Sequence, residues 1–352
     1  MGKQFIDTYN MQGGGAIGLL RPALMDVGSN ILNAYVQEQC VFRFMKTNPS
    51  TTAAIKLTLT AAGGETVETY ISFDRSMTQY YDITEPLRCW INRKTQNLSI
   101  GLTLTKFELE ITEYDANNVE IDTTYFTILA YDAVEPLDVK YEACLPDTFR
   151  MLADASISSY ETACARAIAS ACKVEILLAD GTVQTDYTGV AGDLYTAGWR
   201  FLYNAMSTQT FVRVGVSPNY ETARVDWIQC SDNMAQLRWW SPSCGGYKSV
   251  AVELLLSVAS LSGDAAYIRN FDNVFAASMA GGVKARIPLC TMRDVMYYRD
   301  IYISDEVEMV WNAGLYSYSK RIKIDGEIPE VAANGTADME MTIRLQEVST
   351  EW

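Results

Sequence analysis

The chain has 352 residues, of which 49% are hydrophobic and 20% charged, and its formal net charge is −15. An acidic surface of this size repels phosphate backbones and anionic lipid, and no apolar run approaches the roughly 20 residues that span a bilayer. We therefore expect neither a nucleic-acid partner nor membrane insertion. The chain contains no histidine. This excludes Ser-His and Cys-His nucleophiles and the usual metal sites, so we predict no enzyme activity, no metal and no cofactor.

The first residues, 1–33, are predicted to form a flexible N-terminal arm. The run Gly13 to Gly18 is rich in glycine, which gives up more backbone entropy than other residues when it becomes ordered. The arm nevertheless carries apolar residues, and we name four of them as interface candidates: Phe5, Ile6, Leu19 and Leu20. Burial of these side chains against a neighbouring copy would offset the entropy of ordering, so an assembly arm is expected. A passive, disordered terminus is the alternative.

Residues 34–135 are predicted to form an Ig-like or fibronectin-like β-sandwich. Ile55, Leu57 and Leu59 alternate with polar residues, Gly63-Gly64 interrupts the pattern, and residues 66–73 resume it as the second strand of a hairpin. Seven or so short strands fit within about a hundred residues, which is typical of such sandwiches. The sequence Val134-Glu-Pro-Leu137 then indicates a domain boundary.

Residues 136–352 are predicted to form a second antiparallel β-rich region with one or two helices. One helix is expected near residues 158–172, because Ser158 and Glu161 match a capping box and apolar residues follow at helical spacing. Turn dipeptides at Asp180-Gly181, Asp325-Gly326 and Asn334-Gly335 indicate hairpins. The fold class as a whole is therefore predicted to be mainly β.

The eight cysteines are expected to be free thiols. None forms a CxxC pair, the N-terminus lacks the layout of a signal peptide, and the chain is long enough to bury a proper core without disulfides. The expected site of synthesis is therefore a cytoplasm. The cysteines are Cys40, Cys89, Cys144, Cys164, Cys172, Cys230, Cys244 and Cys290.

The segment Leu237–Ser249 is unusually rich in aromatic residues around a Pro/Gly turn. Trp239 and Trp240 precede the turn and Tyr247 follows it. Consecutive residues of a strand point to opposite faces, so the two tryptophans are both core residues only if both faces of the sheet are covered. We name Trp239, Trp240 and Tyr247 as further interface or binding candidates, with burial inside the sheet as the alternative.

This passage also carries a resemblance. Arg238-Trp239 followed by Gly245-Gly246-Tyr247, in a β-rich chain that ends Met339–Glu347, resembles virion proteins of tailed phages and prophages of the Bacteroidetes, of the tail or tail tip. The similarity covers mainly residues 225–350. It implies a structural protein that assembles symmetrically in the tail, tail tip or neck, with other copies and other virion proteins as partners, and a location in the virion after synthesis in the bacterial host cytoplasm.

Two other functions stay open from the residues. A carbohydrate-binding or adhesive module would present exposed aromatics to a host-surface glycan. A glycan hydrolase would need two carboxylates about 5–10 Å apart in one cleft. The acidic residues considered for that role are Asp74, Asp82, Glu85, Asp226, Asp232, Asp305, Glu306 and Glu308.

Overall fold

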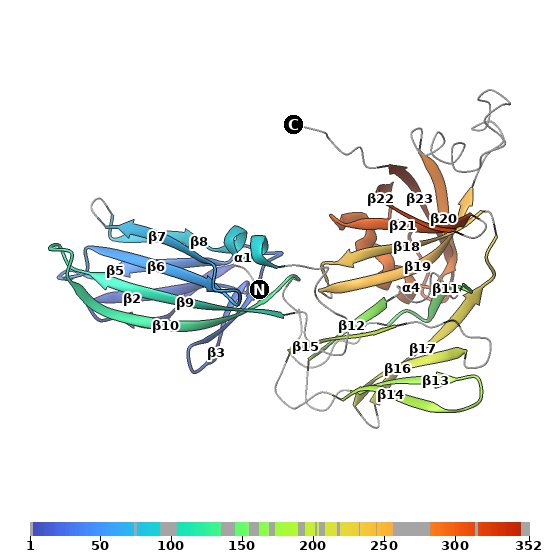
Figure 1. Ribbon diagram of the computed structural model, residues 1–352, viewed down its shortest axis with the longest axis horizontal. Helices are drawn as coiled ribbons and strands as arrows, with labels where there is room; N and C mark the ends of the chain where they lie inside the picture. The colour runs from blue at the N-terminus through green and yellow to red at the C-terminus, as the bar shows by residue number, and fades with distance from the viewer. Residues whose placement is uncertain are drawn as a thin grey trace. The chain divides into compact units, whose positions relative to one another are not determined.

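The computed structural model describes residues 3–73, 76–91, 104–134, 145–154, 162–168, 173–188, 194–200, 203, 208–216, 219–231, 233–243, 245–255, 282–313 and 316–345. The chain divides into two units (Figure 1). Unit 1 comprises Met1–Asn97 and Thr103–Leu137, and unit 2 comprises Leu98–Leu102 and Asp138–Trp352. The boundary after Leu137 coincides with the Val134–Leu137 segment, where the sequence indicates one.

Unit 1 is built from two sheets. The four-stranded sheet has the order β1-β2-β5-β8, with β1 (Gln4–Met11), β2 (Gly15–Arg21), β5 (Val41–Lys46) and β8 (Thr78–Asp82). The six-stranded sheet has the order β3-β4-β10-β9-β6-β7, with β3 (Leu24–Gly28), β4 (Ile31–Tyr35), β10 (Glu120–Tyr131), β9 (Leu104–Tyr114), β6 (Ala54–Ala61) and β7 (Thr66–Ser72). All strand pairs are antiparallel except β4 and β10. The predicted β6–β7 hairpin is confirmed.

The core of unit 1 lies between the inner faces of the two sheets. Alternation along each strand supplies it, because every second residue points inward. The four-stranded sheet contributes Ile17, Leu19, Phe42 and Phe44, and the six-stranded sheet contributes Leu57, Leu59, Leu109, Ile111, Phe126 and Ile128. The predicted sandwich is therefore observed, but its first strand begins thirty residues before the expected residue 34.

The flexible arm expected for residues 1–33 is wrong, because residues 4–28 form β1, β2 and β3 and β4 begins at Ile31. The glycines enable close packing instead of flexibility. Gly15 has φ +146°, and a Cβ there would overlap the Met45 carbonyl oxygen. At the same turn the buried carboxylate of Glu113 accepts hydrogen bonds from the backbone N–H groups of Gln12 at 3.0 Å and Gly13 at 3.1 Å. Deletion of residues 1–30 would thus remove strands from both sheets.

The described strands of unit 2 form three sheets. The first has the order β11-β17-β16-β13-β14, with β11 (Thr148–Leu152), β17 (Asn219–Ile228), β16 (Gln209–Val216), β13 (Lys173–Leu178) and β14 (Val183–Thr188). The second pairs β12 (Thr162–Ile168) with β15 (Leu194–Arg200). The third is a closed barrel, β18-β19-β20-β23-β22-β21, with β18 (Met234–Ser241), β19 (Gly246–Leu255), β20 (Val283–Cys290), β23 (Ala337–Leu345), β22 (Tyr316–Gly326) and β21 (Val307–Ala313).

The helix expected near residues 158–172 is also wrong, because residues 162–168 form β12 and pair antiparallel with β15. This segment alternates alanine with other residues, Ala163, Ala165 and Ala167. Alanine gives little contrast in a period-two hydrophobic pattern, and it has the highest helix propensity of all residues. The pairing of β12 with β15 therefore overrides the local helix propensity of this segment. The Asp180-Gly181 hairpin is confirmed as β13–β14. At Asp325-Gly326, in contrast, β22 continues through both residues.

The described helices are short. In unit 1, α1 spans Thr84–Trp90. In unit 2, α4 spans Met292–Tyr298, and the 3-10 helix η3 continues it over Arg299–Ile303. A capping box formed by Thr291 and Asp294 begins α4. Among the described helices, none has the length and apolar character needed to cross a membrane.

One hydrophobic core joins the parts of unit 2. Side chains of the five-stranded sheet, such as Phe149, Ile176 and Val212, belong to the same buried cluster as barrel residues such as Leu237 and Met339. The ring of Tyr297 from α4 packs edge-on against Phe149, with ring centroids 5.5 Å apart. The fold class predicted from the sequence, mainly β with a fibronectin-like sandwich and a second β-rich region, is confirmed.

Substitution of the turn glycines tests the ordered N-terminus. Gly15→Ala is expected to lower the free energy of unfolding of unit 1 by about 3 kcal/mol, because the methyl group overlaps backbone and the φ value is unfavourable. Gly63→Ala is the matched control, because its methyl group would meet no atom within 4 Å and the change should stay within about 0.5 kcal/mol. Urea unfolding measures both. Equal stabilities of the two variants would contradict the packed turn.

Candidate functional site

The three aromatic candidates of the Leu237–Ser249 segment lie inside unit 2. Trp239, Trp240 and Tyr247 expose only 0%, 1% and 5% of their surface, so they form no accessible platform. Both faces of the β18–β19 hairpin are covered. One face points into the closed barrel, and β19 also contacts β11 and β12 on the other side. The expectation that these residues lie at a contact surface is therefore corrected, and burial is the observed alternative.

The inward face of this hairpin holds a buried ion pair. The Lys248 ammonium lies 3.0 Å from Asp300 Oδ2, donates to the Tyr297 carbonyl oxygen at 2.8 Å, and stands 4.2 Å from the centre of the Tyr297 ring. Asp300 comes from η3, and it also accepts hydrogen bonds from the Trp239 indole at 2.9 Å and the Ser243 hydroxyl at 2.6 Å. The Ser241 hydroxyl donates to the same carboxylate.

The electrostatic balance at Asp300 favours the ionised form. Burial acts to raise the pKa of the carboxyl group, but Lys248 and the donors Ser241, Ser243 and Trp239 outweigh it and hold the pKa below its usual value. Both oxygens of Asp300 are engaged, one by the indole and the other by Lys248 and the two serines. A carboxylate satisfied in this way is suited to holding η3 in the barrel, not to proton transfer.

The opposite face of the hairpin holds a second polar contact. The Tyr247 hydroxyl donates to Glu306 Oε1 at 2.8 Å, and the Arg238 guanidinium stands 4.0 Å from the centre of the Tyr247 ring. Burial, followed by the charge of Glu306, raises the pKa of Tyr247. Trp240 packs edge-on against the same ring at 5.1 Å. Arg238, Trp240 and Tyr247 are thus structural parts of the barrel.

A cavity of about 360 Å³ lies on the barrel beside β20, β22 and β23. It is lined by acidic side chains, with Lys284 as a basic one: Asp325, Glu327, Asp338 and Glu340. Asp338 pairs with Arg286 at 3.3 Å and Asp325 with Arg344 at 3.5 Å. Within the described part of the chain, no group of three or more potential metal ligands is found.

Of the carboxylates considered for glycan hydrolysis, those that the structure describes do not line this cavity. Asp82 accepts from the Thr84 backbone at the start of α1, Glu85 pairs with Arg88 at 3.0 Å, and Asp226 pairs with Arg224 at 2.6 Å. Glu306 binds Tyr247, as described above. Asp74 and Asp232 lie outside the described residues. Absence of catalysis stays a prediction.

The four candidates from the N-terminal segment divide between the two faces of the four-stranded sheet. Leu19 is fully buried in the core, and Ile6 pairs with it across β1 and β2. Phe5 and Leu20 pair on the outer face and are half-buried. The interface prediction is therefore wrong for Leu19, which is a core residue. The sequence could not assign the four residues to two faces, because it predicted a flexible arm and no strands.

The outer face of this sheet carries a cluster that we call the aromatic face, defined by Phe5, Leu20, Val41, Met45 and Tyr80. The rings of Phe5 and Tyr80 come from the two edge strands, β1 and β8, yet their centroids are 5.4 Å apart. They must therefore lean toward each other across β2 and β5. Tyr80 remains 58% exposed.

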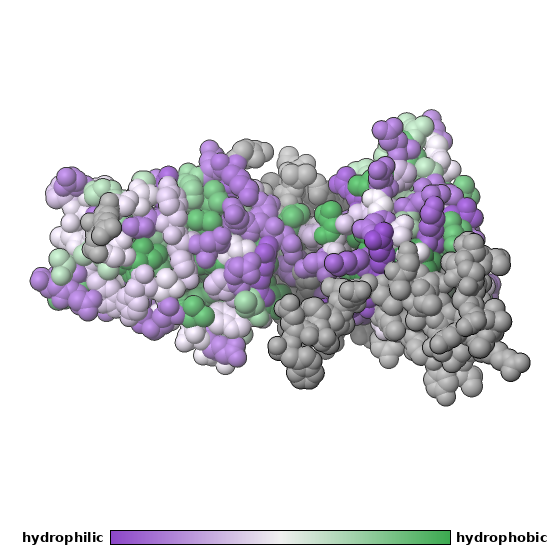
Figure 2. Space-filling view, turned by 90° about the horizontal axis from the view of Figure 1, so that it is seen from above, coloured by the Kyte–Doolittle hydropathy of each residue, from purple (hydrophilic) through white to green (hydrophobic). Residues whose placement is uncertain are grey.

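An ion pair completes the aromatic face. Arg43 contacts Asp7 at 2.6 Å, and its guanidinium stands 5.0 Å from the centre of the Phe5 ring. Gly18 makes this arrangement possible, because a Cβ there would lie 2.6 Å from Asp7 Oδ1. Figure 2 shows hydrophobic and hydrophilic residues interspersed on the surface of the sandwich.

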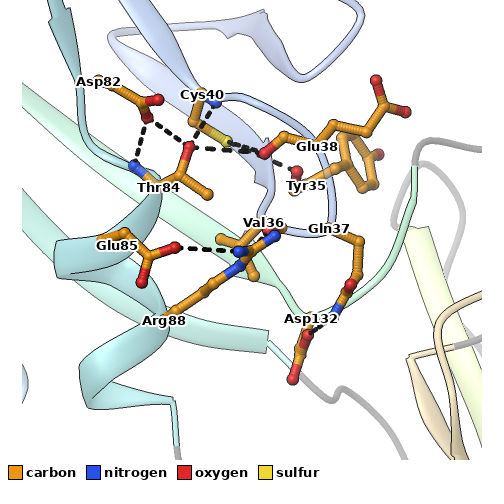
Figure 3. A network of polar contacts seen from close by, with 10 residues as sticks. All are labelled: Tyr35, Val36, Gln37, Glu38, Cys40, Asp82, Thr84, Glu85, Arg88 and Asp132. Carbon is orange, nitrogen blue, oxygen red and sulfur yellow. Dashed lines mark hydrogen bonds and ion pairs between the residues drawn. The ribbon is translucent and has the colours of Figure 1, made fainter. Parts of the chain in front are cut away.

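A polar network ties α1 to the segment after β4 (Figure 3). The Thr84 hydroxyl accepts from the Cys40 backbone N–H at 2.8 Å, and Asp82 accepts from the Thr84 backbone N–H at 2.9 Å. Arg88 donates to the Val36 carbonyl oxygen at 2.6 Å. The Cys40 thiol is enclosed here, and burial raises its pKa to about 12.

Known proteins offer only general likeness. No protein-family model and no curated protein sequence matches the chain. The fibronectin(III)-like modules of CbhA from Clostridium thermocellum align at 11% identity over 60% of this chain and 94% of theirs, with a TM-score of 0.19. A Ca²⁺-stabilised, ice-binding adhesin of an Antarctic bacterium aligns at 12% over 94% and 91%, with a TM-score of 0.18. A tandem repeat from the extending region of a large adhesion protein aligns at 10% over 91% and 82%, with a TM-score of 0.21.

The buried ion pair predicts that the difference in stability between the wild type and the Asp300→Asn variant depends on pH. Asp300→Asn should lower the free energy of unfolding by about 3–5 kcal/mol at pH 7, because Lys248 is left as an unpaired buried charge. The lowered pKa of Asp300 means that its contribution is present above the unfolded value near 3.9 and is lost as pH falls through the folded value. The wild-type advantage should therefore narrow below about pH 4. Urea unfolding across pH 3–7 measures it, and an advantage that does not change with pH would contradict the ionised pair.

Thiol accessibility is predicted for the four described free cysteines. Cys89 and Cys230 are exposed and should react with iodoacetamide in the folded protein, whereas Cys40 and Cys290 are buried and should react only after unfolding. Burial raises the pKa of Cys290 to about 12 as well, which further suppresses its thiolate. Mass spectrometry of labelled peptides distinguishes the pairs. Rapid native labelling of Cys40 would mean that the α1 network opens readily.

Proposed function

We propose that this chain is a structural protein of a tailed bacteriophage particle, where copies assemble symmetrically in the tail, tail tip or neck. The observation that carries the proposal is the aromatic face on the outside of the four-stranded sheet. A sandwich sheet normally presents polar residues to solvent. Here Phe5, Leu20, Val41 and Met45 occupy outward positions, because their strand neighbours Leu19, Phe42 and Phe44 are fully buried in the core.

The aromatic face has the properties of an assembly surface. Exposed apolar side chains gathered around a charged pair occur at protein–protein contacts, and here the Asp7–Arg43 pair lies between the row of Phe5 and Leu20 and the row of Met45. The rings of Phe5 and Tyr80 and the Arg43 guanidinium are among the side-chain types enriched at such contacts. Other copies of the chain and other virion proteins are the proposed partners, and the virion is the proposed location.

The similarity of residues 225–350 to phage virion proteins supports the same proposal. The residues that carry it lie in the β18–β19 hairpin, where Trp239 binds Asp300 and Arg238 covers the Tyr247 ring. These positions contribute to the packing of the barrel. A structural role is in keeping with their burial.

A charge introduced on the aromatic face tests this assembly. We expect the purified wild-type chain to form a closed oligomer by native mass measurement, with rings or tubes in negative-stain electron micrographs. The double variant Leu20→Glu, Tyr80→Glu should be monomeric, because two carboxylates in each contact must be desolvated. Its melting temperature should stay close to that of the wild type, since both side chains are on the outer face.

Tyr125→Glu is the matched control, because this tyrosine is comparably exposed but belongs to the six-stranded sheet. It should leave the oligomer intact. A wild-type chain that stays monomeric at all concentrations would overturn the proposal, and so would a double variant that assembles like the wild type.

A further inference from the structure

We infer that the outer face of the six-stranded sheet is a binding surface for a neutral polysaccharide, with Tyr70 and Tyr125 as its stacking residues. This function goes beyond assembly, and it does not depend on the proposed phage role, because it uses the other sheet of unit 1. The aromatic platform that the sequence suggested at Trp239 and Trp240 is buried. The six-stranded sheet carries exposed rings on β7 and β10.

The residue register defines this face, which we call the hydroxyl face. Strands β7, β6, β9 and β10 place three rows of four residues side by side, and none of the twelve is aliphatic. The first row is Tyr70, Lys56, Thr112 and Thr123, the second is Glu68, Thr58, Glu110 and Tyr125, and the third is Thr66, Thr60, Glu108 and Thr127. Six threonines, three glutamates and two tyrosines supply hydroxyl and carboxylate oxygens throughout.

The two tyrosine rings are the accessible apolar groups of the hydroxyl face. Tyr70 is 65% exposed and Tyr125 is 62% exposed. The Lys56 ammonium stands 5.6 Å from the centre of the Tyr70 ring and pairs with Glu68 at 2.6 Å, which braces that ring on the surface. Tyrosine rings offer a flat apolar surface at low rotamer entropy, and the C–H face of a pyranose ring packs against such a surface.

Charge selects among the possible polymers. Three glutamates of the hydroxyl face point outward. Glu68 pairs with Lys56 and Glu108 pairs with the neighbouring Lys106, so the charge of Glu110 is left uncompensated. The hydroxyl face therefore presents no unpaired cation to a phosphate- or carboxylate-bearing chain such as nucleic acid, and its small excess of negative charge disfavours one. The sugar hydroxyls of a neutral glycan can donate to the carboxylates and exchange hydrogen bonds with the threonines. The chemistry of the face therefore favours a neutral polysaccharide.

Geometry sets the length of the ligand. Tyr70 and Tyr125 are separated by three strand spacings and one step of two residues along the strands, so their Cα atoms lie roughly 16 Å apart. A monosaccharide cannot contact both rings, but an extended oligosaccharide can. β9 and β10 pair over Leu104–Tyr114, so the backbone beneath the rings is held in place before binding. Preorganisation of this kind lowers the entropy loss of binding.

The test uses the full chain and a panel of soluble neutral polysaccharides, namely β-glucan, xylan and galactomannan, with alginate as the anionic comparison. Affinity electrophoresis should show retardation by at least one neutral polymer and none by alginate. Tyr70→Ala and Tyr125→Ala should each weaken binding about tenfold, and the double variant should abolish it. Tyr80→Ala, an exposed tyrosine of the other sheet, should bind like the wild type.

Several outcomes would overturn the inference: no retardation by any neutral polymer, retardation by alginate alone, or a double variant that binds unchanged. Unchanged melting temperatures of the tyrosine variants show that lost binding is not lost folding. Binding is also measured on the Leu20→Glu, Tyr80→Glu variant. Glycan binding by that variant separates this inference from the assembly proposal, because each can fail while the other holds.

Discussion

The structure of unit 2 depends on one buried charge, the carboxylate of Asp300. It brings together η3, both strands of the β18–β19 hairpin and the loop between them. Its donors are Trp239 and Ser241 of β18, Ser243 of the loop and Lys248 of β19. An ion removed from water in this way is tolerated only when every lone pair has a donor. The structure of the barrel therefore depends on the hydrogen bonds to Asp300 as well as on the apolar side chains that line it. Glu113 has the corresponding role in unit 1, where its carboxylate accepts hydrogen bonds from the backbone N–H groups of the glycine turn.

This requirement explains which parts of the fold could be predicted from the sequence. The β6–β7 and β13–β14 hairpins are local, and alternation or a turn dipeptide is enough to identify them. The N-terminal strands are not local. Glycines 13–15 suggest flexibility until the partner that encloses them, a carboxylate a hundred residues away, is known. Only tertiary contacts distinguish a close-packed glycine from a mobile one.

The candidate functional residues also differ in whether local sequence or distant contacts determine their position. Alternation correctly places Trp239 and Trp240 on opposite faces of a strand, but whether the outer face is covered depends on β11 and β12, which are distant in sequence. Lys248 had a weak signal, as the single basic residue in an otherwise uncharged strand segment, and Asp300 had none. The exposed tyrosines Tyr70 and Tyr125 were also missed, because only strand register brings them onto one face.

The two outer faces of the sandwich differ although they belong to one unit of sequence. The outward residues of the four-stranded sheet include the five of the aromatic face beside the charged residues Asp7 and Arg43, whereas none of the twelve residues of the hydroxyl face is aliphatic. Folding stability requires neither choice, since both faces lie outside the core. A polar residue at Leu20 or Val41 would fit a strand as well and would expose less apolar surface. The difference between the two faces is in keeping with the two proposed partners, one a protein surface that excludes water and the other a hydrated polymer.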